Sequence, residues 1–276
     1  MNVQKLAAFS NGDTGGNPAG VVIADQLPPA SEMQRVAAEV GFSETAFAAK
    51  HGDRWLVRYY SPGAEVPFCG HATIALGAAL AMRHGDGVFA LSLSQAEITV
   101  EGRRDGGVYS AALQSPPTRS GPASADLVAA ALELFGLGPD DLDDRIPVAT
   151  AHGGVDHLVV MLQRRATLSA MKYDFDRGAA LMKQAGWVTV LLGHAHTPQL
   201  FSTRNAFAYG GVYEDPATGA ATAALAGYLR DLGWPHAGVI DILQGDDMGM
   251  SSRIRAEIPP TVGASIRVSG TARVMG

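Results

Sequence analysis

Glu44 is the carboxylate in this chain best suited to acid–base chemistry. It lies in the segment 43–47, among small and apolar residues. Loss of water strengthens a carboxylate as a base, so we take Glu44 as the candidate general base for proton transfer. A half-buried strand exposes alternate residues, and the segment by itself favours a solvent-facing Glu44.

His71 and Asp215 are the next candidates, because each lies where a helix is predicted to begin. A histidine there can bind an anion or relay a proton, and the simpler alternative is a capping or core histidine. Asp215 can bind a substrate or serve only as a turn residue. Glu65 and Glu214 occupy similar positions before the two predicted helices, and we expect both to be solvated loop carboxylates.

Cys69 is the only cysteine, which excludes an internal disulfide and a zinc site built from several thiolates. A helix N-terminus favours the thiolate, so Cys69 is either a reactive thiol or a buried inert one. His194 and His196 have no third ligand at a suitable spacing. Residues 244–249 lack the oxygen ligands of a calcium loop and are interpreted as a turn. No metal and no cofactor is predicted.

The residues around Cys69 recur later in the chain. When 69–76 is laid over 218–225, glycine, alanine, threonine and leucine match in register. Gly70 and Gly219 each open an apolar helix, and such starts offer free N–H groups to an anion. The match indicates a duplicated half. The two helix starts are therefore candidates for binding one ligand across a central cleft.

The remaining pattern predicts alternating strands and helices in both halves. We expect Ser31 and Ser124 to cap helices, and residues 115–123, rich in proline, serine and glycine, to link the halves. Expected helices cover 31–40, 70–82, 125–135, 175–185 and 219–232. Expected strands cover 3–9, 20–24, 43–47, 55–60, 88–93, 98–101, 108–113, 146–149, 157–162, 188–192, 200–202, 239–244, 253–258, 265–268 and 272–275.

The composition favours a protein whose partner is a small molecule. The net charge is −6 and 47% of residues are hydrophobic, and no basic run suggests nucleic acid or a membrane surface. No segment reaches the ~20 apolar residues of a transmembrane helix. We expect a cytoplasmic protein.

Together these motifs resemble the PhzF family of phenazine-biosynthesis isomerase-like proteins, which have a diaminopimelate epimerase-like fold. The phrases that carry the resemblance run along the whole chain: 16–19, 43–47, 65–73, 214–219, 244–245 with 248–249, and a C-terminal strand pair. The resemblance implies an α+β fold of two pseudo-symmetric domains, each a curved, mostly antiparallel sheet around a central helix. The site would lie in the cleft between them. The expected halves are 1–117, with strands 264–276 returning to it, and 118–263.

The resemblance also implies roles for particular residues. Glu44 matches the catalytic acid/base, and His71 and Asp215 match polar catalytic residues. Gly70, Gly219 and Ala220 fall at the helix starts that bind the substrate carboxylate. No cofactor and no metal is implied, and a homodimer is.

This chain departs from the family at several positions. Ala220 stands where serine is common, so a hydroxyl that could contact the substrate is missing. Met250 stands where arginine is common, which is expected to change substrate specificity or a surface contact. In the related epimerases two cysteines act from opposite faces of the substrate. Here Cys69 matches one of them and Thr218 stands at the other, which argues against a two-thiol racemase.

Three functions follow, in order of preference. The first is a cofactor-independent isomerase that moves a proton on a small cyclic or amino carboxylate, of the trans-2,3-dihydro-3-hydroxyanthranilate isomerase type. The second is a non-catalytic protein that binds a small carboxylate. The third is a single-base epimerase or racemase.

Overall fold

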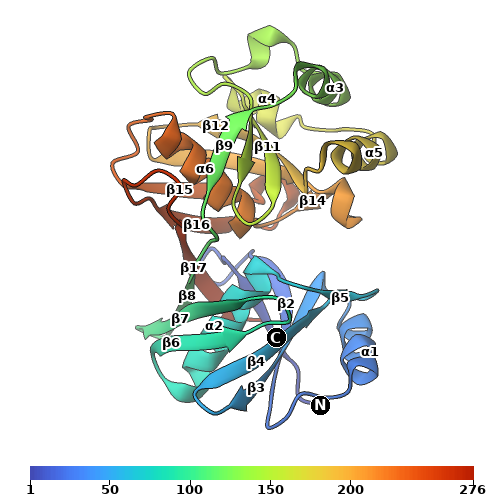
Figure 1. Cartoon of the computed structure of the whole chain (residues 1–276), viewed down its shortest axis with the longest axis vertical. Coiled ribbons are helices and arrows are strands. Elements are labelled where there is room, and N and C mark those ends of the chain that lie inside the picture. The colour runs from blue at the N-terminus through green and yellow to red at the C-terminus, as the bar shows by residue number, and fades with distance from the viewer. The chain divides into compact units, whose positions relative to one another are not determined.

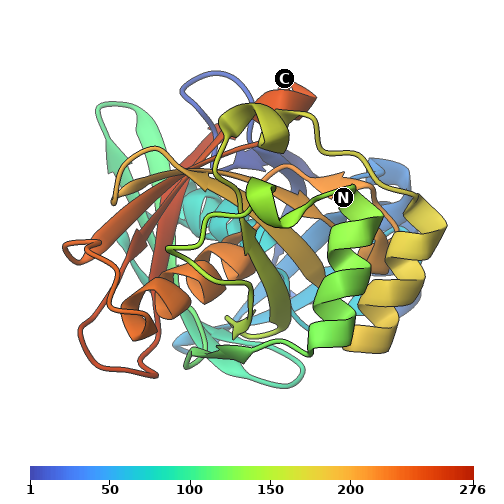
Figure 2. The ribbon, with the colours of Figure 1, turned by 90° about the horizontal axis from the view of Figure 1, so that it is seen from above.

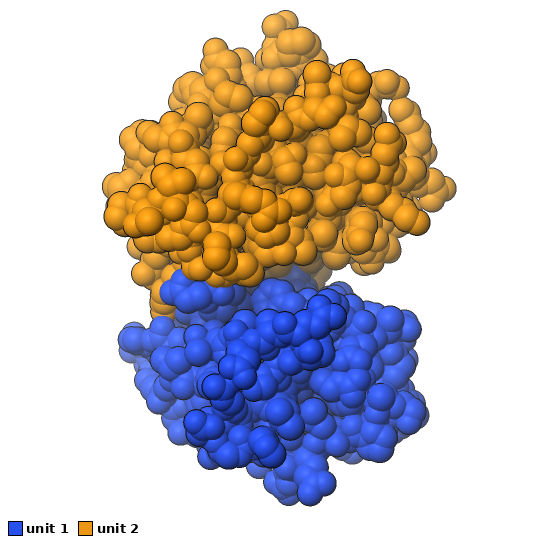
Figure 3. Space-filling view, in the orientation of Figure 1, with its two compact units in different colours: residues 1–114, 269–276 blue, residues 115–268 orange.

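The computed structural model describes residues 1–276, which form two compact units (Figure 3). The first unit contains residues 1–114 and 269–276, and the second contains 115–268. The expected division lay after residue 117, with the C-terminal part joining the first half from residue 264. In the structure, residues 115–117 and 264–268 belong to the second unit.

The first unit is a mixed sheet with two helices (Figure 1). Its strands pair antiparallel except where a helix intervenes: β2 and β3 are parallel across α1, and β4 and β6 are parallel across α2. Its elements are β1 (Gln4–Ala8), β2 (Asn17–Ala24), α1 (Ala30–Val40), β3 (Glu44–His51), β4 (Arg54–Tyr60), β5 (Glu65–Val66), α2 (Gly70–His84), β6 (Gly87–Ser92), β7 (Glu97–Asp105) and β8 (Val108–Gln114).

Helix α2 is buried on all sides because strands surround it. It packs against β1, β2, β3, β6, β7 and β8, and every residue from His71 to Ala81 is buried. Such a helix needs small residues to let the strands approach. A Cβ on Gly102 of β7 would lie 2.2 Å from the Gly77 carbonyl oxygen of α2. The alanine and glycine content of this segment therefore reflects its place at the centre of the unit.

The second unit contains the elements that follow β8, apart from the last strand, β17 (Arg267–Val274), which pairs with β1 and belongs mostly to the first unit. They are β9 (Arg119–Pro122), α3 (Ala125–Phe135), β10 (Ala149–His152), β11 (Asp156–Met161), α4 (Arg165–Ser169), α5 (Phe175–Ala185), β12 (Thr189–Ala195), β13 (Leu200–Ala206), β14 (Glu214–Asp215), α6 (Gly219–Asp231), β15 (Val239–Gln244) and β16 (Ser252–Glu257), with short 3-10 turns at Pro139–Asp141, Ala208–Gly210 and Asp246–Met248. Helices α3 and α5 lie side by side over a core that includes Trp187 (Figure 2).

The two units share one topology. Strands β11 and β12 are parallel across α4 and α5, and β13 and β15 are parallel across α6. Antiparallel pairs join β10 to β11, β12 to β13, β13 to β14, and β15 to β16. This is the same series of ladders that connects β1 through β7. The sequence repeat is thus matched by a repeat of strand pairing, with α2 and α6 in equivalent places.

Several expected boundaries differ from the structure. Ser31 is not a cap, because α1 already begins at Ala30 after Pro29. The strand expected at 146–149 runs from Ala149 to His152. The two strands expected at 265–268 and 272–275 are one strand, β17 (Arg267–Val274). None of the helices combines the length and apolar character needed to cross a membrane.

Candidate active site

Glu44 and His71 come together at the start of α2. Glu44 is the first residue of β3, and His71 is the second residue of α2. The Glu44 Oε2 and His71 Nε2 atoms are 3.4 Å apart, and the two side chains are only 17% and 8% exposed. Glu44 is therefore largely withdrawn from water, unlike the solvent-facing carboxylate that the strand pattern also allowed.

Two more polar side chains surround the His71 imidazole. The Ser43 Oγ atom lies 3.3 Å from Nε2, and the Cys69 Sγ atom lies 3.4 Å from Nδ1. Cys69 is the N-cap residue of α2, so its thiol is held where the helix N–H groups are unpaired. Sequence reasoning did not select Ser43. Its position immediately before Glu44 was the available signal.

A buried hydrogen-bond chain holds the first turn of α2 in place. The Thr73 hydroxyl donates to the Cys69 carbonyl oxygen at 2.7 Å, and the Tyr59 hydroxyl is 2.7 Å from Thr73 Oγ1. Because the Thr73 proton is already used, Tyr59 acts as the donor. Burial raises the pKa of Tyr59 well above its usual value, so this donor keeps its proton.

The start of α6 is organised by Gln244. The Thr218 hydroxyl donates to Asp215 Oδ2 at 2.5 Å. The Gln244 amide donates to the Asp215 carbonyl oxygen at 2.7 Å and to Thr218 Oγ1 at 3.0 Å, and its oxygen accepts the Thr218 N–H. Gln244 is the buried last residue of β15, the strand that the sequence predicted over 239–244. Gly219 and Ala220 follow as the first residues of α6.

Glu65 and Glu214 are not free loop carboxylates. Arg58 binds Glu65 through two nitrogens in the first unit, and Arg204 binds Glu214 in the same way in the second. The Arg204 and Glu214 side chains are 9% and 4% exposed, and Arg204 also donates to the Ser169 carbonyl oxygen at 2.9 Å. The expectation of a solvated carboxylate was wrong for Glu214, which is buried, whereas Glu65 is exposed and ion-paired. The sequence did not show that either glutamate lies beside an arginine of the adjacent strand.

The ladders identify the counterpart of Glu44 in the second unit. Tyr60 pairs with both Thr45 and Glu65, just as Ala206 pairs with both Val190 and Glu214. Glu44 and Thr189, the residues before Thr45 and Val190, are therefore equivalent. The second unit has a hydroxyl where the first has a carboxylate.

Thr189 belongs to a buried polar chain. His157 Nδ1 is 2.8 Å from Thr189 Oγ1, and the Thr189 hydroxyl donates to Asn205 Oδ1 at 3.1 Å. Burial lowers the pKa of His157 to about 3, so His157 is neutral and donates through Nδ1. The His157 Nε2 and Asn205 Nδ2 atoms at the two ends of the chain are buried without a hydrogen-bond partner.

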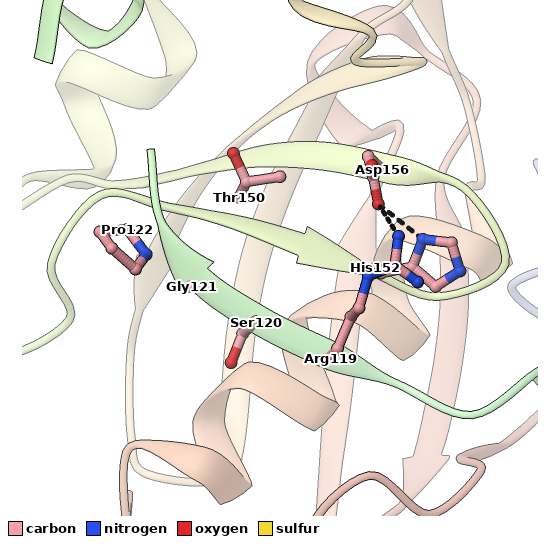
Figure 4. Close-up of a pocket in the computed structure, with 7 residues that line it drawn as sticks. All are labelled: Arg119, Ser120, Gly121, Pro122, Thr150, His152 and Asp156. Atoms are coloured by element: carbon pink, nitrogen blue, oxygen red, sulfur yellow. Dashed lines mark hydrogen bonds and ion pairs between the residues drawn. The ribbon is translucent and has the colours of Figure 1, made fainter. Parts of the chain in front are cut away.

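A pocket of about 230 Å³ lies on β9, β10 and β11 (Figure 4). Asp156 Oδ1 accepts from His152 Nδ1 at 2.6 Å and from Arg119 at 3.1 Å. None of the predicted site residues lines this pocket.

The side chains of Glu44, Cys69 and His71 are close enough together to bind one metal ion. Their ligand atoms all lie within 4.8 Å of one another. The absence of a required metal or cofactor stays a prediction from the sequence.

Comparison with known proteins shows that the chain is similar in sequence to isomerases. The chain is 32% identical over 257 residues to trans-2,3-dihydro-3-hydroxyanthranilate isomerase of Pseudomonas fluorescens, covering 91% of this chain and 88% of that protein. It is also 32% identical over 240 residues to the uncharacterized isomerase YddE of Escherichia coli O157:H7, covering 82% and 78%.

Solved structures agree on the fold. The PhzF-family phenazine biosynthesis protein of Bacillus anthracis superposes with a TM-score of 0.86 at 24% identity, covering 100% of this chain and 98% of that one. A probable proline racemase from Agrobacterium radiobacter superposes with a TM-score of 0.66 at 12% identity, covering 99% and 91%. The mixed α/β fold is thus shared with PhzF proteins and with a racemase. The family model for phenazine biosynthesis-like proteins, PhzC-PhzF, matches residues 6–275, and the chain belongs to this family of isomerases.

Proposed function

We propose that this isomerase moves a proton on a small cyclic or amino carboxylate without a cofactor, with Glu44 as the general acid/base. One observation carries the proposal: a largely buried carboxylate lies 3.4 Å from a buried imidazole at the N-terminus of a central helix. The reaction type is that of trans-2,3-dihydro-3-hydroxyanthranilate isomerase, the name of a relative that is 32% identical.

In this mechanism Glu44 removes a proton from a substrate carbon and returns it to another carbon on the same face. His71 holds the Glu44 carboxylate in position and hydrogen-bonds a substrate oxygen as charge develops there. Positioned acid–base groups of this kind contribute about 10²–10⁴-fold in rate. The N–H groups at Gly70 and His71 supply partial positive charge for a substrate anion.

The second unit contributes binding in this proposal. Asp215 hydrogen-bonds a polar group of the substrate, and the N–H groups at Gly219 and Ala220 bind its carboxylate. The same substrate is held by the starts of α2 and α6. The repeated topology supports this arrangement, because each central helix begins after an equivalent short strand, β5 or β14.

The residues of the second unit that correspond to Glu44 and Cys69 favour a reaction with one catalytic base and not two. Thr189 takes the place of Glu44, and Thr218 takes the place of Cys69. A racemase with a base on each face would need Asp215 as its second base, and the hydroxyl of Thr218 already donates to this carboxylate. A single-base epimerase and a non-catalytic carboxylate-binding protein are the alternatives.

Deuterium uptake in heavy water tests the proposal. Wild-type protein is incubated with a panel of small cyclic and amino carboxylates, and incorporation is followed by mass spectrometry. Uptake into one class of compound, abolished in Glu44→Gln and retained in Glu39→Gln, would support Glu44 as the base. Glu39 is a suitable control because it lies on the exposed surface of α1.

The alternatives give different results in the same assay. A ligand that wild type and Glu44→Gln bind equally well, without exchange into any compound, would replace the isomerase with a binding protein. Inverted configuration in the recovered substrate would indicate an epimerase. Weaker binding of the same ligand by Asp215→Asn would support a substrate shared between both units. The expected homodimer is tested separately by the mass in solution.

A further inference from the structure

We infer that Glu44, Cys69 and His71 form a binding site for a borderline-soft divalent cation such as Zn²⁺, and that the bound cation switches the isomerase off. The inference rests on the proposed function only for the second part, because inhibition requires Glu44 to be the base. The metal site itself depends on geometry within the first unit.

The three side chains offer the donor set that zinc prefers. Cys69 supplies sulfur, His71 nitrogen and Glu44 oxygen, and these ligand atoms lie within 4.8 Å of one another. Zinc sites in proteins are built from these three donor types, and three protein ligands leave a fourth position for water or substrate.

The observed spacing is close to that of a metal site. Bonds of about 2.3 Å to sulfur and about 2.0–2.2 Å to nitrogen and oxygen place tetrahedral ligand atoms about 3.4–3.6 Å apart. His71 Nε2 lies 3.4 Å from Glu44 Oε2 and 3.9 Å from Cys69 Sγ. Closing the set around one ion therefore needs side-chain movements of about 1 Å or less.

The backbone beneath the site is fixed. The Tyr59 and Thr73 hydroxyls tie down the Cys69 carbonyl, and the Cys69 carbonyl also accepts the Thr73 N–H at 3.0 Å. The positive end of α2 disfavours a cation, but a thiolate and a carboxylate carry two negative charges that outweigh it. A second shell that holds the ligands in place typically strengthens metal binding.

Bound zinc would use the Glu44 lone pair that the proposed reaction needs. Zinc is therefore expected to inhibit, and its removal by a chelator to restore activity. Metal here is a regulator of the site and is not required for turnover.

The test uses metal-free full-length protein and Co²⁺ as a spectroscopic substitute for Zn²⁺. One equivalent of cobalt should give thiolate-to-cobalt absorption, which Zn²⁺ then displaces. Cys69→Ser should abolish this absorption and weaken zinc binding by about tenfold or more. His196→Gln is the control, because His194 and His196 are two neighbouring histidines outside the proposed site, with ring centroids 4.9 Å apart.

The outcomes separate the metal site from the catalytic proposal. Equal zinc affinity of wild type and Cys69→Ser, or cobalt binding without the thiolate absorption, would overturn the site. Zinc binding through Cys69 that leaves deuterium exchange unchanged would overturn the inhibitory role. Exchange is compared with each variant's own zinc-free rate. A protein that binds cobalt through Cys69 yet exchanges no compound would refute the proposed function and leave the metal site standing.

Discussion

The starts of α2 and α6 are built on the same backbone plan and carry different chemistry. Each follows a short strand whose glutamate binds an arginine on the adjacent strand, Arg58–Glu65 in the first unit and Arg204–Glu214 in the second. Around the helix starts the side chains diverge: Glu44 is matched by Thr189, and His71 by Ala220. The ion pair beside the turn is thus present in both units, whereas the carboxylate–imidazole pair of Glu44 and His71 is present only in the first.

The ion pairs themselves differ in environment. Arg58 and Glu65 are each 32% exposed, whereas Arg204 and Glu214 are almost completely buried. A surface pair contributes little because water screens it, whereas loss of one partner from a buried pair leaves an uncompensated charge. The Arg204–Glu214 pair is therefore expected to affect the free energy of unfolding more than the Arg58–Glu65 pair does.

The largest expected effect on deuterium exchange comes from replacing the proposed base, Glu44, by the residue type found at the equivalent position of the second unit. Glu44→Thr should lower deuterium exchange by about 10²–10⁴-fold, because the proton acceptor is removed. The free energy of unfolding, measured by urea denaturation, should change much less in Glu44→Thr than in Arg204→Met, which breaks a buried ion pair. Exchange at the wild-type rate in Glu44→Thr would show that the asymmetry between the units is unrelated to catalysis.

The second prediction concerns the two ion pairs. Arg204→Met should reduce the free energy of unfolding by about 3–5 kcal/mol, because Glu214 is left buried without its partner. Arg58→Met should cost only about 0–1 kcal/mol, because its partner is reached by water. Denaturant titration of both variants measures the difference. Equal costs would contradict the contrast drawn from their exposure.

The third prediction concerns pH and the His157 chain. Burial lowers the pKa of His157 to about 3, below its ordinary value of about 6.5 in the unfolded chain. The unfolded state therefore binds the extra proton first, so His157 destabilises the native state as pH falls from about 6.5 towards 3. The slope is about 1.4 kcal/mol per pH unit.

Replacement of this histidine isolates its contribution. His157→Gln should have a flatter dependence of unfolding free energy on pH over that window, whatever its stability at neutral pH. Urea denaturation at several pH values measures the slopes. Parallel curves for the variant and wild type would argue that His157 is accessible to protons in the native state.

The smallest expected effect comes from Ala220. Ala220→Ser restores a hydroxyl at the second helix start, and one added hydrogen bond of about 0.5–1.5 kcal/mol would tighten substrate binding by about 2–10-fold. The measurement is the KM of the exchange reaction, or the Kd of a bound carboxylate. Ala38→Ser, on the exposed side of α1, serves as the control. An unchanged affinity would place the ligand away from the α6 start.

Part of the fold could be predicted from local patterns. The apolar runs after Gly70 and Gly219 predicted two central helices, and α2 and α6 begin at these residues. The predicted caps were only partly correct: Ser124 occupies the N-cap position of α3 without a side-chain capping hydrogen bond, and Ser31 lies inside α1. Pro29 already provides the start of α1, so the serine signal was redundant.

The candidate site was only partly predictable for a different reason. Glu44, His71 and Asp215 were selected individually, and Ser43 was not. Gln244 was predicted at the end of a strand, but the hydrogen bonds of its amide to Asp215 and Thr218 were not anticipated. A buried hydrogen bond between distant segments leaves no periodic signal in either segment, because it depends on which strands are neighbours and in what register.

The sequence by itself determined the repeat, the two helix starts and the family, because these depend on residue types at fixed spacing along the chain. Tertiary structure decided that Glu44 faces His71 and that Glu214 is buried against Arg204. It also decided that the second unit presents Thr189 where the first presents its base. These placements depend on which segments are neighbours in space and on the register of the strands, because a shift of one residue would turn the side chains of a strand to the opposite face.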